Sequence, residues 1–311
     1  MTPIVQISEL SKHFGEIKAV EGLSFSVYEG DIYGFLGQNG AGKSTTLRML
    51  LTLVKPTAGR IDVFGRDLQK HRREILREVG AVIERPDLYR YLTGYENIAL
   101  FARMTGLKLS RKRLMDQLDQ VGLAERSHSQ VKTYSQGMKQ RLGIAIALVH
   151  DPRLIVLDEP TNGLDPQGIA DMRNLIRDLS ARHKKTILLS SHLLSEVELI
   201  CNRMLIIDRG KKIVEGLVNE LFHPSNILVE LETLDAGKTR AFIRDSTWKL
   251  LLKKELDGKF FFEMDKRFIP DLARDLVSNG IDLVGLQPRH SLEEYFLSLT
   301  TPNQHVDAFA N

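Results

Sequence analysis

Residues 37–45 read G-Q-N-G-A-G-K-S-T and match the pattern G-x-x-x-x-G-K-[ST], after an apolar run and before a helical pattern. In this context the glycines let backbone N–H groups surround phosphate oxygens, and the start of the helix adds partial positive charge. A chance match somewhere in a chain of 311 residues has odds of roughly 1% from average composition. This stretch therefore predicts a site for nucleotide phosphates.

Three side chains at the start of the helix are expected to make different contacts. Lys43 would reach the β- and γ-phosphates, Ser44 a magnesium ion and Thr45 an α-phosphate oxygen. The residues assigned to the whole site are Gly37, Gln38, Asn39, Gly40, Ala41, Gly42, Lys43, Ser44, Thr45 and Thr46.

A second stretch, R-L-I-V-L-D-E-P at 153–160, is an apolar strand that ends in two carboxylates. Alone, such a stretch is more often a plain strand and turn, but the glycine loop reverses those odds. Asp158 is expected to hold magnesium, through water, and Glu159 to polarise the attacking water as a general base.

His192 ends another predicted strand, in S-S-H at 190–192. An isolated histidine is commonly a surface or capping residue. However, the carboxyl ends of parallel strands meet at the edge of the sheet where ligands bind. We therefore predict that His192 senses the γ-phosphate and is catalytic.

The composition, net charge and apolar runs of the chain exclude several classes of protein. The chain is 42% apolar and 27% charged, which is typical of a globular protein. Its net charge of +3 is too small to indicate a nucleic-acid partner. The single cysteine, Cys201, fits a reducing compartment. The N-terminus shows no secretory pattern, and the apolar run at 144–149 is far shorter than the about 20 residues of a membrane-spanning helix. We expect a cytoplasmic chain, and any membrane role must come from a partner.

Strands and helices alternate through the first part of the chain, which predicts an α/β fold with a mostly parallel sheet covered by helices on both faces. Residues 93–122 interrupt this alternation with two consecutive helical patterns. The helix that starts at Lys43 is expected to end at Pro56. We assign 1–222 to one domain, with a helical subdomain at about 85–135.

The remaining residues, 223–311, are expected to form a small accessory α+β domain after the linker H-P-S-N at 223–226. Its pattern of strands and helices reads βαββαβ, with a hairpin turning at Asp257-Gly258 and an added helix at 291–299. That order is typical of a ferredoxin-like domain. It contains no chemical motif.

Together these motifs resemble the ATP-binding subunits of ABC transporters over about residues 1–220. S-Q-G-M at 135–138 stands where that family commonly has L-S-G-G-Q. Ser135 and the Gly137 amide match this signature, whereas Gln136 departs from it. N-G-L-D at 162–165 resembles the loop after the paired carboxylates, with Asp165 as its last residue.

The resemblance also assigns two residues outside these motifs. Phe14 stands where an aromatic ring stacks on adenine. Glu84 stands where the family usually has a glutamine, so it is carried over as a coupling-loop residue that binds magnesium or forms a structural ion pair.

The resemblance implies a P-loop NTPase fold of ABC type, with an antiparallel β subdomain and a helical insertion beside the mostly parallel sheet. It also implies ATP and Mg²⁺ as cofactors, and a homodimer in which the signature of each copy caps the ATP bound by the other. A separate integral membrane permease would hold the chain on the cytoplasmic face of the membrane. We expect Tyr89 to Tyr95 to line the groove for that permease.

The segments I-E-R-P-D-L-Y and S-L-E-E-Y-F-L-S-L-T, at 83–89 and 291–300, resemble subunits that export bacitracin, lantibiotics and other drugs. They favour export of a drug, peptide or lipid-like compound over import. Two alternatives stay open: a soluble ABC ATPase acting on ribosomes or nucleic acid, and a module whose first role is regulation or dimerisation through 225–311. The signature and His192 argue against a third, a kinase with the same glycine loop.

Overall fold

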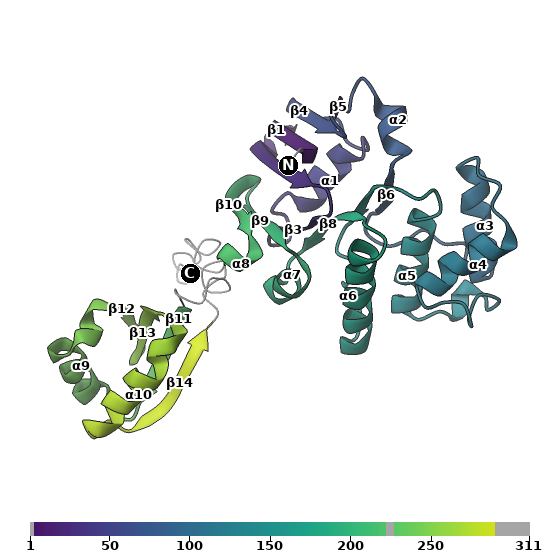
Figure 1. The fold of residues 1–311 in the computed structure, drawn as a ribbon. Coiled ribbons are helices and arrows are strands. Elements are labelled where there is room, and N and C mark those ends of the chain that lie inside the picture. The colour runs from purple at the N-terminus through teal and green to yellow at the C-terminus, as the bar shows by residue number, and fades with distance from the viewer. Residues whose placement is uncertain (1–2, 222–226, 290–311) are drawn as a thin grey trace, which may run out of the picture. The chain divides into compact units, whose positions relative to one another are not determined.

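The computed structural model describes residues 3–221 and 227–289 (Figure 1). The chain divides into two compact units, Met1–Leu217 and Val218–Asn311. No helix in the described part of the chain is both long and apolar enough to cross a membrane.

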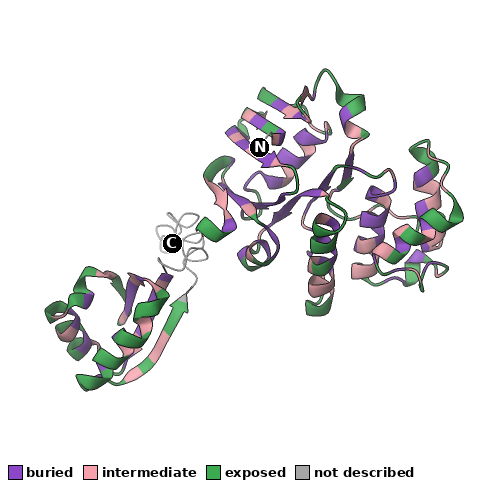
Figure 2. Ribbon diagram, in the orientation of Figure 1, coloured by how far each residue is buried: buried purple, intermediate pink, exposed green. Residues whose placement is uncertain are grey.

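The first unit is built on a six-stranded sheet in the order β10-β9-β3-β8-β7-β6. Five of these strands are parallel, and β10 pairs antiparallel at the edge. Every residue of β3, β7 and β8 is buried (Figure 2), because both faces of a parallel sheet are covered. The predicted mostly parallel sheet is therefore confirmed. Its strands are β3 Ile32–Leu36, β6 Val79–Val82, β7 Leu154–Leu157, β8 Thr186–Ser191, β9 Arg203–Asp208 and β10 Lys211–Leu217.

A second, antiparallel sheet in the same unit has the order β2-β1-β4-β5. It confirms the antiparallel subdomain that the resemblance implied. Bulges interrupt the register where β1 pairs with β2, so apolar and polar residues do not alternate regularly along the full length of these strands. These strands are β1 Pro3–Phe14, β2 Ile17–Tyr28, β4 Ala58–Val63 and β5 Arg66–Asp67.

The helical insertion contains α3 and α4, which pack on each other and on α5 beside the parallel sheet (Figure 1). Thr93 caps α3 with a capping box closed by Glu96. Helix α1 ends earlier than expected, since Thr52 has a φ of 59° and turns the chain before Pro56. The helices of this unit are α1 Lys43–Leu50, α2 Arg72–Leu76, α3 Gly94–Met104, α4 Arg111–Gln120, α5 Gln136–Ala147, α6 Pro166–Ala181 and α7 Leu194–Ile200.

The second unit begins with α8, Val218–Leu221, and contains a four-stranded antiparallel sheet in the order β12-β13-β11-β14. This order, with α9 and α10 inserted after β11 and β13, is the βαββαβ arrangement that the sequence predicted. Its core includes Phe260, Phe262, Leu272 and Leu276. The predicted helix at 291–299 lies outside the described residues. The other elements are β11 Ile227–Thr233, α9 Ala236–Asp245, β12 Leu252–Leu256, β13 Lys259–Met264, α10 Ile269–Ser278 and β14 Leu283–Arg289.

Candidate functional site

The glycine loop connects the carboxyl end of β3 to the start of α1, at the centre of the parallel sheet. Gly40 and Gly42 have φ angles of 83° and 108°, in the left-handed region that favours glycine. A Cβ atom on Gly37 would lie 2.6 Å from the carbonyl oxygen of Ile207, so that position also excludes a side chain. The backbone of the loop is therefore free to face a ligand closely.

Lys43, Glu159 and His192 converge beside this loop from α1, the end of β7 and the end of β8. The Lys43 side chain is only 4% exposed, and its Nζ lies 3.1 Å from Oε1 of Glu159. Nζ also donates to the carbonyl of Gly37 at 2.7 Å. Nδ1 of His192 contacts the other oxygen of Glu159, Oε2, at 2.7 Å. The three residues assigned to catalysis thus form one connected cluster.

Glu159 has a φ of 51°, an unusual conformation for a residue with a Cβ. Its backbone N–H donates to the hydroxyl of Ser190 at 2.9 Å. This contact fixes the peptide that carries the proposed base. Such strained conformations cost about 1–3 kcal/mol and concentrate at functional sites.

Asp158 lies beside this cluster and is 1% exposed. Its Oδ1 accepts hydrogen bonds from Ser190 Oγ at 2.6 Å and from Ser44 Oγ at 3.1 Å. Its Oδ2 is buried and has no hydrogen-bond partner within residues 3–221 and 227–289.

This pairing of Asp158 with Ser44 fits a magnesium ion. Mg²⁺ prefers oxygen ligands and is usually held by one or two carboxylates together with substrate phosphates and water. In the described parts of the chain, no three His, Cys, Asp or Glu side chains converge as a complete metal site. The donor set therefore suits a metal that arrives with a nucleotide.

The other residues assigned to nucleotide binding differ in their exposure and in their hydrogen bonds. Gln38 and Asn39 are exposed on the loop, whereas Thr45 is half-buried in the first turn of α1. Thr46 is 1% exposed, and both its N–H and its hydroxyl donate to the Gly42 carbonyl. Thr46 therefore supports the first turn of α1 from within.

Phe14, at the end of β1, is 49% exposed, as an aromatic platform for a base requires. The Nζ of Lys12 lies 4.7 Å from the centre of its ring.

Glu84 forms an ion pair with Arg48 of α1. Its side chain is 63% exposed, and its backbone has a φ of 59°. Of the two roles left open by the sequence, the geometry favours the structural ion pair.

A second cavity, of about 390 Å³, opens where two helices begin. Ser135 caps α5, accepting from the N–H of Met138 at 3.2 Å, and Asp165 caps α6, accepting from the N–H of Gly168 at 3.0 Å. Both helix starts carry partial positive charge, which favours an anion. The cavity is lined by Ser135, Gln136, Gly137, Arg141, Gly163, Leu164, Asp165, Gln167, Gly168 and Asp171.

A third cavity, of about 340 Å³, is lined by Asp87, Leu88, Tyr89 and Phe101. Tyr89 is 52% exposed and lies beside Phe101, with ring centres 6.2 Å apart. Tyr95, by contrast, faces His128, so it does not line this cavity. Of the segment Tyr89 to Tyr95, Tyr89 is the residue that lines this cavity.

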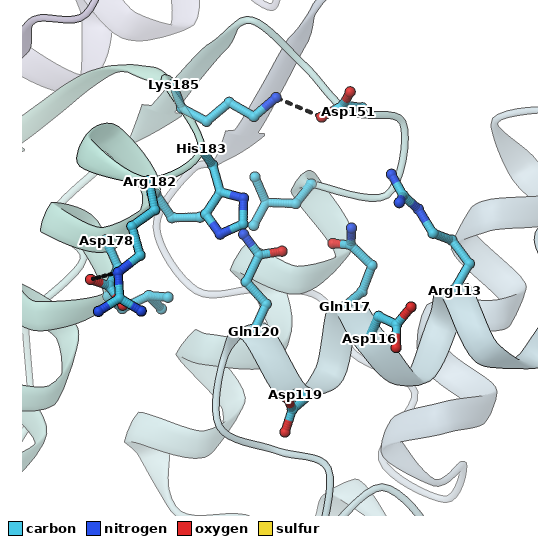
Figure 3. Close-up of a pocket in the computed structure, with 13 residues that line it drawn as sticks. Arg113, Asp116, Gln117, Asp119, Gln120, Asp151, Asp178, Arg182, His183 and Lys185 are labelled. Atoms are coloured by element: carbon cyan, nitrogen blue, oxygen red, sulfur yellow. Dashed lines mark hydrogen bonds and ion pairs between the residues drawn. The ribbon is translucent and has the colours of Figure 1, made fainter.

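The largest of these cavities, of about 460 Å³, was not predicted from the sequence (Figure 3). It separates α4 from the end of α6 and from the turn after α5, and Gln117 and Gln120 point into it from α4. Two ion pairs lie along its rim: Lys185 with Asp151, and Arg182 with Asp178. Its walls come from three segments, 113–120, 148–151 and 175–185, that lie far apart in the sequence, so no local spacing could have indicated it.

Comparison with known proteins agrees with this geometry. Residues 20–162 match the model of the family described as ABC transporter. The bacitracin transport ATP-binding protein BcrA of Bacillus licheniformis is 40% identical over 303 residues, covering 96% of this chain and 98% of that protein. The chain belongs to the ABC transporter ATP-binding proteins.

A further relative and a solved structure agree with this assignment. The linearmycin resistance ATP-binding protein LnrL of Bacillus subtilis (strain 168) is 33% identical over 310 residues, covering 96% of this chain and 98% of that protein. The dimeric post-hydrolysis structure of the ATP-binding cassette MJ0796, bound to ADP and Pi, superposes with a TM-score of 0.62 at 26% identity. It covers 69% of this chain and 98% of that one. The ABC ATP-binding subunit described here is accordingly an ATPase.

Proposed function

We propose that this ABC subunit forms a homodimer around two ATP molecules and drives a separate membrane permease that exports a drug, peptide or lipid-like compound. The observation that carries the proposal is the separation of two anion sites. One is the glycine loop with its cluster of Lys43, Glu159 and His192. The other is the cavity at the starts of α5 and α6, lined by Ser135 and Asp165.

The two sites are complementary halves of one nucleotide pocket in this proposal. A helix start alone contributes about 0.3–1 kcal/mol to anion binding. Charge-assisted hydrogen bonds contribute about 1.5–3 kcal/mol each. Contacts from Ser135 and the Gly137 amide to two γ-phosphates could therefore supply the about 5.5 kcal/mol that turns a mostly open dimer into a mostly closed one. Hydrolysis would remove these contacts and reopen the dimer.

At the glycine loop, the position of each side chain supports a proposed role in hydrolysis. Asp158 and Ser44 would hold the magnesium ion, which neutralises charge on the phosphates when bound. Glu159 would accept a proton from the attacking water, since its carboxylate lies between Lys43 and His192 beside the glycine loop. Lys43 would contact the β- and γ-phosphates. His192, whose Nδ1 lies 2.7 Å from Oε2 of Glu159, would turn Nε2 toward the γ-phosphate.

The groove at Tyr89 and Phe101 is the proposed contact with the permease. It lies at the start of the helical insertion, a few residues after Glu84. Tyr91, 81% exposed, adds a large surface ring close by in the sequence. Exposed aromatic rings beside a cavity are typical anchors for a partner helix.

The proposed cargo comes from the relatives. Two proteins that align over nearly the whole of this chain are described by bacitracin transport and by linearmycin resistance. An antibiotic or similar amphipathic compound is therefore the class of cargo to test first.

The experiment that tests the dimer uses three purified variants. Glu159→Gln should form a stable dimer with ATP in sedimentation velocity, because ATP binds but is not cleaved. Ser135→Arg should hydrolyse ATP poorly, since its bulk would clash with the phosphate held by the partner copy. Mixing Ser135→Arg with Lys43→Ala should restore at most one working site per dimer. Full ATPase activity of a strictly monomeric sample would overturn the proposal.

A further inference from the structure

Glu196 is a buried carboxylate with no role in the hydrolysis proposed above. It lies in the first turn of α7 and is 6% exposed. Its Oε2 accepts hydrogen bonds from the hydroxyls of Thr161, at 2.5 Å, and of Ser191, at 3.2 Å. Its Oε1 is buried and finds no hydrogen-bond partner among the residues that the structure describes.

One hydroxyl comes from the loop after β7, and the other comes from the end of β8. Thr161 follows Glu159 and Pro160 and begins the T-N-G-L-D loop, which ends at Asp165. Ser191 is the last residue of β8 and directly precedes His192. Both hydroxyls are buried, with Thr161 5% and Ser191 1% exposed. A single carboxylate oxygen therefore joins loop 161–165 to the turn that carries His192.

Stability alone does not account for this carboxylate. Removing a carboxylate from water is costly, and two hydroxyl donors on one oxygen leave the other oxygen uncompensated. An apolar side chain of similar volume is often neutral or stabilising at such a position. The position of this buried carboxylate is better explained by the two segments that it joins, loop 161–165 and the turn that carries His192.

The two segments that Glu196 joins also reach the two proposed nucleotide sites. Gly163, Leu164 and Asp165 line the cavity at the start of α6, which the proposed function assigns to the partner's nucleotide. At the other end, His192 contacts Glu159 at 2.7 Å. A shift of loop 161–165 would therefore pull on Ser191 through Glu196 and change the position of His192 beside Glu159.

We propose that Glu196 is a positioning residue that couples loop 161–165 to His192. Binding of a nucleotide at the cavity of Ser135 and Asp165 would thereby set the geometry of hydrolysis at the glycine loop of the same chain. This inference rests on the proposed function, because it requires that loop 161–165 meets a second ATP.

The test compares two substitutions of similar size. Glu196→Met removes both acceptor oxygens, whereas Glu196→Gln keeps one oxygen that can accept from both hydroxyls. We expect Glu196→Met to lower kcat by about tenfold and Glu196→Gln to stay within about twofold of wild type, in line with measured coupling effects. Closure around two ATP molecules should make the dependence of rate on ATP concentration sigmoidal in the wild type, and this dependence should become less steep in Glu196→Met. ATP binding measured without turnover and Tm should stay close to wild type.

A matched control is Asp31→Asn. Asp31 is also 6% exposed and hydrogen-bonded, but it precedes β3, at the end of the strand away from the glycine loop. Its substitution should lower Tm and leave kcat and the shape of the ATP curve unchanged. If Glu196→Met fails to fold, the double variant Thr161→Val with Ser191→Ala removes the same link from the donor side and should show the same loss.

Two results would overturn the inference. One is an unchanged kcat and ATP curve in Glu196→Met or in the double variant. The other is a loss in Glu196→Gln as large as that in Glu196→Met. Failure of the proposed function looks different, since a strictly monomeric wild-type sample would then show full ATPase activity.

Discussion

Nδ1 of His192 lies 2.7 Å from Oε2 of Glu159, although the two residues are 33 positions apart in the chain. The contact exists because β7 and β8 are parallel neighbours, so their carboxyl ends place both side chains at one edge of the sheet. A carboxylate at this distance accepts the Nδ1 proton, which fixes the tautomer and orients the ring. Lys43 then contacts the remaining oxygen of the same carboxylate at 3.1 Å.

Glu159→Gln is expected to lower kcat by about 10²–10⁴-fold, the usual contribution of a general base. ATP binding should persist, because the amide keeps the shape of the side chain and leaves the glycine loop intact. Single-turnover hydrolysis and equilibrium binding of ATP measure the two effects separately. Wild-type turnover in this variant would exclude Glu159 as the base.

Ser190→Ala should impair hydrolysis without changing any group that contacts ATP directly. Ser190 is completely buried, donates to Asp158 at 2.6 Å and accepts from the Glu159 N–H at 2.9 Å. Its loss leaves a buried N–H unpaired, at a cost of about 1–3 kcal/mol, and loosens both carboxylates. We expect kcat to fall by about tenfold to 10²-fold, as for small misplacements of catalytic groups.

The Ser190 prediction has two matched comparisons. Ser190→Thr retains the hydroxyl and should recover most of the activity. Thr186→Val removes another buried hydroxyl from the opposite end of β8, where it accepts from the Gly30 N–H, and should affect Tm alone. An equal loss of kcat in Thr186→Val and Ser190→Ala would show that the strand as a whole, and not the Ser190 contacts, matters.

The order of strands explains why the sequence predicted some of this site and missed the rest. The glycine loop and the Asp158–Glu159 pair are local patterns, so they can be found without knowing the fold. Ser190 was visible in the S-S-H stretch, but its partners depend on β8 lying beside β7, which periodicity does not reveal. Glu196 was missed for the same reason, since its contact with Thr161 spans 35 positions.

The early end of α1 has a different origin. Leu47, Leu50 and Leu51 are buried at helical spacing, yet the chain leaves the helix after Leu50. The apolar spacing continues through Val54 because that residue also packs on the core from the following turn. A residue just past the end of a helix can therefore be buried without being helical, so hydrophobic spacing alone does not identify the last helical residue.

Glu84→Gln is expected to leave the Mg²⁺ dependence of hydrolysis unchanged and to reduce Tm by a small amount. The ion pair with Arg48 is largely exposed, and exposed pairs contribute about 0–1 kcal/mol. Arg48→Gln removes the same pair from the other side and should give the same Tm shift. A raised requirement for Mg²⁺ in Glu84→Gln, absent from Arg48→Gln, would instead assign Glu84 to the metal.

Acid should destabilise the protein partly through His150. Burial lowers the pKa of His150 below its usual value of 6.5. Its Nε2 donates to the carbonyl of Val79 at 3.1 Å, and its buried Nδ1 lacks a hydrogen-bond partner in the described part of the chain. A proton on Nδ1 would therefore be buried without an acceptor.

The sign of the pH effect follows from this lowered pKa. Above pH 6.5 His150 is neutral in both the folded and the unfolded chain, so it adds no pH dependence. As pH falls through about 6.5 the unfolded chain takes up a proton that the folded chain resists, and stability declines until the lower folded pKa is passed. Tm measured at pH 7.5, 6.5 and 5.5 should fall less steeply in His150→Gln, which keeps an N–H donor for Val79. His183→Gln, at an exposed position, should fall as steeply as wild type; identical slopes in all three proteins would contradict the assignment.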